Sequence, residues 1–533
     1  MKRCPECGRN YNDDSMSFCL DDGSELLFGP ASMNEPATAI LSVPSAIAGD
    51  LRQEINRGDE SKTAVFNSVE SQTDSSRSIA VLPFVNTSTD PENEYFCDGL
   101  AEELINALSK INELKVAART SAFSFKGKSS DVGDIGQRLG VKTVLEGSVR
   151  KSGNRLRISV QLVNAADGFH LWSERYDREM QDIFDLQDEI TLAVVDALKL
   201  KLFGEDRSEL LKKGTTNAEA YEFYMRGRYF WNRRRIDDFG RAIEQFEKAI
   251  ELDPDYALAY TGLADCFIFL GFYEAFPPSV AGPKAETVLR KAIEMDATLA
   301  ESQASLAAYK LCFEFDWKGA EEGLLRAIEL NPRLITARYW YAMVLTTLGR
   351  FDEAIEQGRI ALELDPLNLI ASANVARALY IAHRFDEAIE LCQRTIEIDA
   401  NFYFTHAVLG LTYHVTGKFD DAIHHLRTAV STSDIPFVTS ILGFALARSG
   451  QADEARQILA AYVEQSDQKY ISPCAFCLIY IGLDEIETAM DWLDKAWEER
   501  SVQLVWLKTE PVFDSLRSEP RFKRVLKLMG LPE

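Results

Sequence analysis

The sequence predicts a multidomain chain in which a helical solenoid follows a mixed α/β domain and a small cysteine-bearing unit. Helix-pair motifs recur over 217–500 with a period of about 34 residues, which predicts the solenoid. Strand-like and helix-like runs alternate over 77–205, which predicts a layered α/β domain. Three cysteines fall in the unit at 1–27. A linker at 28–76, rich in small and polar residues, and a closing segment at 501–533 complete the chain.

Composition and charge exclude several classes of function. Apolar residues make up 46% and charged residues 26% of the 533 residues, which is typical of globular proteins. The net charge of −25 repels phosphate backbones, so we expect no nucleic-acid partner. No apolar run approaches the ~18 residues of a membrane span, and the basic start MKRCPECGRN lacks the apolar part of a signal peptide. Scattered cysteines indicate reduced thiols, so we expect a cytoplasmic protein.

The cysteine-bearing unit has the spacing of a metal site. Cys4 and Cys7 form a C-x2-C pair followed by Gly8, Cys19 comes later, and Asp22 stands where a second pair would end. Zinc accepts aspartate oxygen as well as thiolate, so these four side chains could form a closed tetrahedral site. The unit resembles a zinc ribbon with an altered second knuckle. We expect a structural zinc ion that supplies the folding energy, and a ribbon that has lost its metal is the alternative.

The linker contains two similar stretches, PATAILSVP and SKTAVFNSV. Thr38 and Thr63 are each followed by alanine and two apolar residues. Such a repeat in a linker could be a phosphorylation or docking motif. Chance similarity in a segment rich in threonine and alanine is the alternative.

The α/β domain is expected to begin with a buried strand, SIAVLPFVN, followed by an amphipathic helix, DGLAEELINALSKI. A short strand, a helix ending at Gly140, a strand meander and a closing helix follow. The segments YFCDGLAEEL, LKVAARTSAFSFKGK, LGVKTVLEGSVR and ISVQLVNAADGFHLWSERYD resemble the TolB amino-terminal-like (FlgO-like) domain, a bacterial family. That resemblance implies an interaction or sensory module and supplies no catalytic residues.

No catalytic motif is complete in the α/β domain. Gly127-Lys128-Ser129 looks like the end of a phosphate-binding loop, but Ala122 stands where the motif needs glycine. His170 and Asp167 lie in one strand-turn region, with no serine or cysteine nucleophile tied to them. We therefore expect a protein that is not an enzyme.

The repeats carry the strongest pattern in the sequence. Phe351, Phe385 and Phe419 recur at one constant spacing, and apolar residues between them recur at helical spacing. Glycines such as Gly349 end first helices, His383 replaces that glycine in one repeat, and Asp-Pro or Asn-Pro pairs end second helices. Small residues stand where two helices must approach closely: Gly227, Ala308, Ala342, Ala376, Gly410 and Gly443.

These features resemble the tetratricopeptide repeat, and we count about eight repeats, the second with an insertion. Stacked helix pairs form a superhelix with a concave face, which the first helix of each pair lines in this family. That resemblance implies a partner-binding groove with these side chains: Tyr221, Tyr224, Arg228, Trp231, Tyr339, Met343, Arg377, Tyr380, Leu411 and His414. Packing between neighbouring helices is the alternative role of each. The segment 501–533 is expected to be an amphipathic helix pair that caps the solenoid.

Together these features predict a non-enzymatic cytoplasmic adaptor that binds protein or peptide partners in bacterial signalling or regulation. Aromatic and arginine side chains are the usual anchors of such surfaces. The alternative is a ligand sensor, in which the TolB-like domain binds a small molecule and controls partner binding by the repeats.

Overall fold

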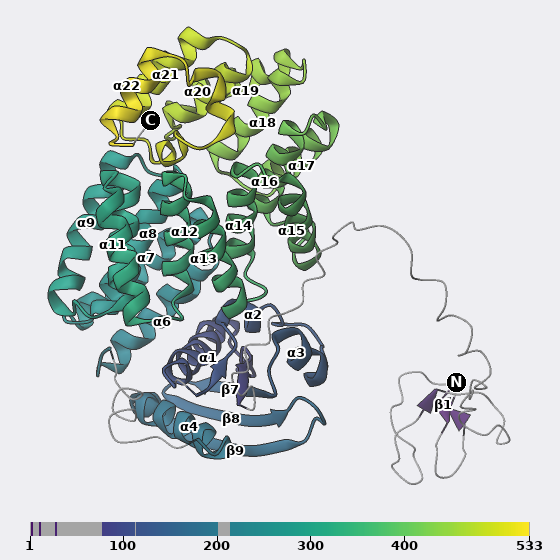
Figure 1. Ribbon diagram of the computed structural model, residues 1–533. Coiled ribbons are helices and arrows are strands. Elements are labelled where there is room, and N and C mark those ends of the chain that lie inside the picture. The colour runs from purple at the N-terminus through teal and green to yellow at the C-terminus, as the bar shows by residue number, and fades with distance from the viewer. Residues whose placement is uncertain are drawn as a thin grey trace. The chain divides into compact units, whose positions relative to one another are not determined.

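The structure is a computed structural model of the 533-residue chain, shown in Figure 1. It describes residues 77–111, 113–200 and 214–531, and three short strands near the N-terminus. The chain divides into two units, 1–71 and 72–533. In the first unit the strands form an antiparallel sheet in the order β2-β1-β3. Their bounds are β1 (Lys2–Arg3), β2 (Asn10–Tyr11) and β3 (Leu27–Phe28).

The second unit begins with a mixed sheet in the order β6-β4-β7-β8-β9, with β5 paired to β7. Strand β4 runs parallel to β6 and β7, whereas β7, β8 and β9 form an antiparallel meander. This arrangement confirms the predicted mixed α/β region. The strands are β4 (Ser78–Val81), β5 (Val85–Asn86), β6 (Lys115–Val116), β7 (Thr143–Ser152), β8 (Arg155–Asn164) and β9 (His170–Glu179). The helices are η1 (Pro91–Asn93), α1 (Glu94–Ser109), α2 (Arg119–Phe123), α3 (Val132–Leu139), η2 (Met180–Asp182) and α4 (Ile183–Ala197).

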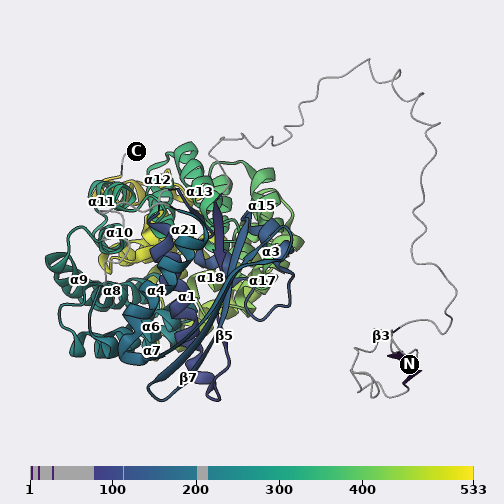
Figure 2. The same ribbon diagram turned by 90° about the horizontal axis from the view of Figure 1, so that it is seen from below.

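Helices cover both faces of this sheet because the central strands are apolar on both sides. In β4, Ile79 and Val81 join the core that contains α1 and α4, whereas Ala80 joins a second core with Ile135 of α3. Successive strand residues point to opposite faces, so the continuous run SIAV needs a cover on each side. Figure 2 shows α1 and α4 beside one face of the strands and α3 beside the other.

Eight helix pairs follow in the described residues 218–498, and they form the solenoid that the repeated motifs predict. The first four pairs are α6 (Ala218–Asn232) with α7 (Ile236–Leu252), α8 (Ala257–Phe272) with α9 (Pro278–Met295), α10 (Ala300–Tyr309) with α11 (Trp317–Leu330), and α12 (Ile335–Leu348) with α13 (Phe351–Leu364). A π turn, η3 (Lys310–Glu314), extends α10. The other four are α14 (Leu369–Ile381) with α15 (Phe385–Ile398), α16 (Tyr403–Val415) with α17 (Phe419–Ser431), α18 (Pro436–Arg448) with α19 (Ala452–Gln465), and α20 (Pro473–Gly482) with α21 (Ile486–Glu498).

Close helix approach explains the small residues of the repeats. A Cβ atom added at Gly227 would lie 2.5 Å from the Phe246 ring, and one at Gly410 would lie 2.6 Å from Leu426. The turns inside the pairs use the left-handed conformation, as predicted, with φ of 83° at Gly349. His383 also adopts it, with φ of 60°.

We expect the His383→Gly variant to be about 1 kcal/mol more stable than the wild type, since a left-handed backbone strains any residue with a Cβ atom. The reverse change at the matching turn, Gly417→Ala, should cost about 1 kcal/mol. Denaturant unfolding of the full chain measures both. A loss of stability in His383→Gly would mean that the contact of its ring with Phe385, 5.5 Å between centroids, outweighs the strain.

The α/β domain packs against the first helix of the first repeat. Helix α1 contacts α6, and Met225 of α6 fills the space left by Gly99 of α1. Glu102 of α1 accepts hydrogen bonds from Arg119 at 2.7 Å, Arg228 at 2.8 Å and Asn232 at 3.1 Å. Burial raises the pKa of Glu102, but the charges of the two arginines outweigh it and lower the pKa to about 2. A buried, fully paired carboxylate therefore joins the two domains.

The same domain also reaches the loops of later repeats. Arg333, between α11 and α12, donates to the carbonyl oxygens of Ser109, at 3.4 Å, and Leu114, at 2.9 Å. Asp365, between α13 and α14, accepts a hydrogen bond from the backbone of Ser121 at 2.9 Å. These contacts join the domain to loops at one edge of the solenoid.

The closing segment differs from the capping helix pair that the sequence predicts. It contains two 3-10 turns, η4 (Val502–Trp506) and η5 (Pro511–Leu516), and one α-helix, α22 (Pro520–Leu528). Its apolar run, Val502 and Leu504–Leu507, is at most 3% exposed. Gln503 donates to the carbonyl of Phe272 at 3.0 Å, and Trp317 donates to that of Met529 at 2.8 Å. The segment thus packs against the early repeats, because so apolar a run cannot face solvent.

Candidate partner-binding surfaces

The ten side chains predicted to line the inner groove do not form an open surface. Arg228 and His414 are half-buried. The other eight are buried: Tyr221, Tyr224, Trp231, Tyr339, Met343, Arg377, Tyr380 and Leu411. The burial of these eight fits the alternative role, packing inside the chain. A role of these residues in partner binding stays a prediction.

The α/β domain covers the groove residues of the first repeat. The ring of Tyr221 lies 5.1 Å from that of Phe184 in α4, and Gln187 of the same helix donates a hydrogen bond to the Tyr221 hydroxyl. Arg228 faces α1, where it pairs with Glu102. The first helix of the solenoid is thus part of a domain interface.

The closing segment covers the groove residues of the fifth repeat. Arg377 of α14 forms an ion pair with Glu510, and its guanidinium lies 3.9 Å from the centre of the Trp506 ring. The Arg377 and Glu510 side chains are only 9% and 2% exposed. Burial, and next the charge of Glu510, raise the pKa of Tyr380 well above its usual value. These contacts place the chain's own segment where a partner peptide was expected.

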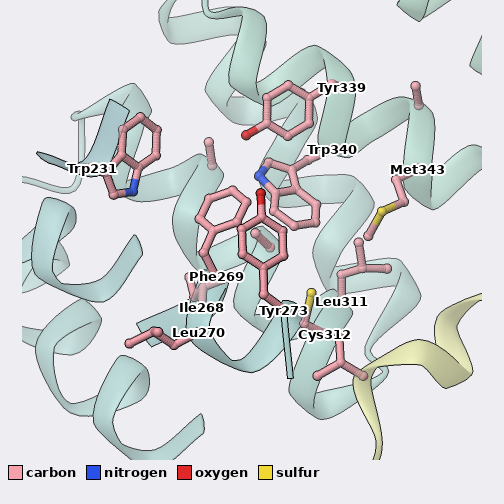
Figure 3. Packing of buried hydrophobic residues seen from close by; sticks show 14 of the residues in the cluster. Trp231, Ile268, Phe269, Leu270, Tyr273, Leu311, Cys312, Tyr339, Trp340 and Met343 are labelled. Atoms are coloured by element: carbon pink, nitrogen blue, oxygen red, sulfur yellow. The ribbon is translucent and has the colours of Figure 1, made fainter. Parts of the chain in front are cut away.

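The remaining groove residues pack among the repeats. Figure 3 shows Trp231, Tyr339 and Met343 together with Phe269 and Trp340 in one buried cluster. His414 packs between Phe419 and Phe444, with ring centroids 5.3 and 5.1 Å away, and burial lowers its pKa to about 4. It is therefore neutral at pH 7.

An open groove does exist elsewhere, between the second and third repeats and the last two. It has a volume of about 980 Å³. Phe476 and Trp492 stack in its wall with ring centroids 4.2 Å apart, and Val463 is 64% exposed at its edge. The rest of its lining comes from Pro277, Pro278, Ser279, Gly282, Pro283, Tyr309, Phe313, Ser466, Asp467, Lys469, Tyr470, Ile471, Lys495, Glu498, Glu499 and Arg500.

The chemistry of this groove suits an apolar anchor with polar flanks. Its charged lining balances Lys469, Lys495 and Arg500 against three carboxylates, so it selects no strongly charged partner. The Lys495 ammonium lies 4.8 Å from the Trp492 ring and already covers one aromatic face. Aromatic walls inside a polar rim are typical of binding surfaces.

The other predicted sites lie mostly outside the described residues. Cys4, Cys7, Cys19 and Asp22 are among those whose side chains the structure does not describe, and so are Thr38 and Thr63. The zinc site and the phosphorylation sites therefore stay predictions. Within the described residues, no group of three or more His, Cys, Asp or Glu side chains could hold a metal ion. Cys474 and Cys477 of α20 are buried free thiols, and burial raises the pKa of each.

Known families match the two main domains of the chain. A family model for the tetratricopeptide repeat matches residues 224–275, 316–368, 348–401 and 408–470. The C-terminal part is therefore a tetratricopeptide-repeat solenoid. Residues 75–193 match a model described as the HilA/YgeH-like transcriptional regulator, second domain. The expected TolB-like identity of this domain stays a prediction.

One curated relative, from Rhizobium meliloti (strain 1021), bears the name "Putative adenylate cyclase 3". It is 35% identical over an alignment of 286 residues, and the match covers 52% of this chain. The chain spans only 41% of that relative's length.

Solved structures with similar repeats share little sequence with the chain. A thermophilic tetratricopeptide-repeat protein of Thermus thermophilus is 23% identical, with a TM-score of 0.30, over 32% of this chain and 92% of its own. A human IFIT1 dimer bound to m7Gppp-AAAA is 14% identical, with a TM-score of 0.41, over 59% of this chain and 77% of its own. No helix in the described residues is long and apolar enough to cross a membrane.

Proposed function

We propose that this chain is a non-enzymatic scaffold that binds partner proteins through its tetratricopeptide repeats in bacterial signalling or regulation. The observation that carries the proposal is the open, aromatic groove beside Trp492. The side chains predicted for the inner face form no comparable open surface, since most of them are buried. Partners therefore bind at this groove rather than on the inner face.

The other parts of the chain have supporting roles in this proposal. The α/β domain, whose sequence resembles the TolB-like family, covers the first helix of the solenoid and acts as a second interaction module. Its match to the second domain of a transcriptional regulator supports a regulatory role. Residues 1–27 would bind zinc through Cys4, Cys7, Cys19 and Asp22 and act as a third docking unit in the cytoplasm.

The proposal is tested with a variant that changes only the groove. Val463 is 64% exposed, so Val463→Glu should fold as well as the wild type and add a charge at the apolar edge. The full chain is purified from its own cells, and the proteins that it retains are quantified by mass spectrometry. We expect the true partners to fall about tenfold or more in Val463→Glu.

Leu528→Glu is the matched control, because Leu528 is a similarly exposed aliphatic residue, at 55%, on α22 and outside the groove. It should retain every partner that the wild type retains. If Val463→Glu keeps the same partners at wild-type levels, the groove does not bind them. If both variants lose them equally, added charge rather than the groove is responsible, and the assignment also fails.

A further inference from the structure

The sheet of the α/β domain has two edges of very different length. One edge is β6, with 2 residues, and the other is β9, with 10. Figure 1 shows β9 as the outermost strand, and among the described residues no strand pairs with its outer side. Exposed edge strands are usually short, bulged or interrupted by proline, because a long regular edge pairs with another chain. β9 contains no proline, and its single register shift, between Leu162 and Val163 of β8, leaves 172–179 regular.

The hydrogen-bond pattern shows which backbone groups of β9 face outward. Met180 donates to the carbonyl of Asn154 at 2.8 Å, and this pair continues the register in which Glu179 lies opposite Arg155. Bonded and non-bonded pairs alternate along an antiparallel ladder, so every second residue turns its N–H and C=O away from β8. The outward residues of β9 are Ser173, Arg175, Asp177 and Glu179. Their backbone groups form one side of a ladder that a second strand can complete.

The charges of β9 are complementary to those of a second β9. Its sequence, HLWSERYDRE, contains acidic and basic side chains on both sides of Tyr176. When two copies run antiparallel with Tyr176 opposite Tyr176, Arg175 of each strand lies opposite Asp177 of the other. In the same register, Glu174 of each strand lies opposite Arg178 of the other. Both kinds of pair occur twice, and opposite charges placed across two strands stabilise the pairing.

Neighbouring registers lack this complementarity. Residues that lie opposite each other must both be bonded or both be non-bonded, so the two-fold axis must pass through a residue position. With the axis at Arg175, two arginines oppose each other, and with the axis at Glu174 or Asp177, two carboxylates do. Like charges placed directly opposite each other destabilise a strand pair. With the axis at Ser173, no opposite charges meet, so the charge pattern selects the register centred at Tyr176.

The charged side chains of β9 remain available to a second copy. Arg175 is 66% exposed, and its contact with Asp177 is a long one of 4.0 Å. Asp177 accepts a hydrogen bond from Arg157 of β8 at 2.8 Å, in a pair that is also exposed. Exposed pairs of this kind contribute little stability, so a second strand can share them. Copies of a chain with a net charge of −25 repel each other in general, so association needs a surface on which both signs are present.

We propose that the chain forms a two-fold symmetric dimer in which two β9 strands pair antiparallel, with Tyr176 at the axis, and join the two sheets into one. The dimer goes beyond the scaffold function, since β9 is not part of the groove beside Trp492. Each dimer carries two such grooves. A partner with two binding segments that span both grooves is therefore held more tightly than by one chain.

The test follows the association of the full chain by sedimentation velocity, between about 1 and 100 µM, where the wild type should become a dimer. Arg175→Asp and Asp177→Arg each place two pairs of like charges across the axis. Each variant alone should therefore dimerise about tenfold or more weakly. An equimolar mixture of the two variants should recover the dimer, because every like-charge pair becomes an opposite-charge pair when the two variants combine.

Arg394→Asp is the matched control, because the Arg394 side chain is similarly exposed, at 63%, and lies on α15. It should dimerise as the wild type does. A wild type that stays monomeric at about 100 µM overturns the proposal. Equal weakening in Arg394→Asp, or dimers that both β9 variants keep at wild-type strength, also overturns it, since another surface or the overall charge is then responsible. A mixture that stays monomeric contradicts the register and overturns the proposal as well.

Discussion

We expect the free energy of unfolding of the Glu510→Ala variant to be about 3–5 kcal/mol lower than that of the wild type. Its carboxylate is 2% exposed and pairs with Arg377, which is 9% exposed. Removal of one partner leaves the guanidinium charge buried and unpaired beside the Trp506 ring. Urea unfolding of the full chain, followed by tryptophan fluorescence, measures the loss.

Two further variants separate the ion pair from the rest of the segment. Lys523→Ala changes an exposed side chain of α22 and should alter stability by less than about 0.5 kcal/mol. The double variant Arg377→Met, Glu510→Leu should recover most of the loss, because apolar residues of similar volume often replace a buried pair without cost. A loss below about 1 kcal/mol in Glu510→Ala would show that the pair does not hold the closing segment in place.

The second large effect is a dependence of stability on pH that comes from Glu274. This carboxyl is 3% exposed, in the turn after the second repeat's first helix, and burial raises its pKa to about 8. The hydroxyl of Ser472 and the backbone of Phe437 oppose this rise only in part. In the unfolded chain its pKa is near 4.5. The folded protein therefore favours the neutral, protonated form of the Glu274 carboxyl.

A raised folded pKa gives stability that is present below about pH 4.5 and is lost as the pH rises through 8. Glu274→Gln keeps the shape of the side chain and stays neutral, so its stability should match that of the wild type near pH 5. At pH 8 it should be more stable than the wild type by a few kcal/mol, because one unit of difference between the folded and unfolded pKa corresponds to about 1.4 kcal/mol. Tm measured at both pH values checks this. Glu464→Gln, at an exposed carboxyl, should show no such difference between the two pH values. Equal stability of Glu274→Gln and wild type at pH 8 would contradict the prediction.

Local patterns in the sequence predicted most of the repeat architecture. Helix pairs, small residues such as Gly410 and left-handed turns such as Gly417 depend on contacts within one repeat or between neighbours. Those contacts recur once in every repeat, so the period of the sequence reveals them.

The coverage of the inner face was also not predictable from one repeat at a time. Gln187 and Tyr221 are separated by 34 residues and belong to different domains, and Arg377 and Glu510 are separated by 133 residues. The apolar run around Trp506 indicated a buried segment, but it did not indicate which surface of the protein the segment would cover.

The sequence by itself determined that this protein is a tetratricopeptide-repeat solenoid behind a mixed α/β domain, because helix periodicity and strand patterns are set by residues near one another. Only the tertiary structure decided which surface is open. The α/β domain and the closing segment cover Tyr221 and Arg377, and the groove beside Trp492 remains. The physical reason is that burial depends on apolar segments far apart in the chain, and no local pattern encodes their partners.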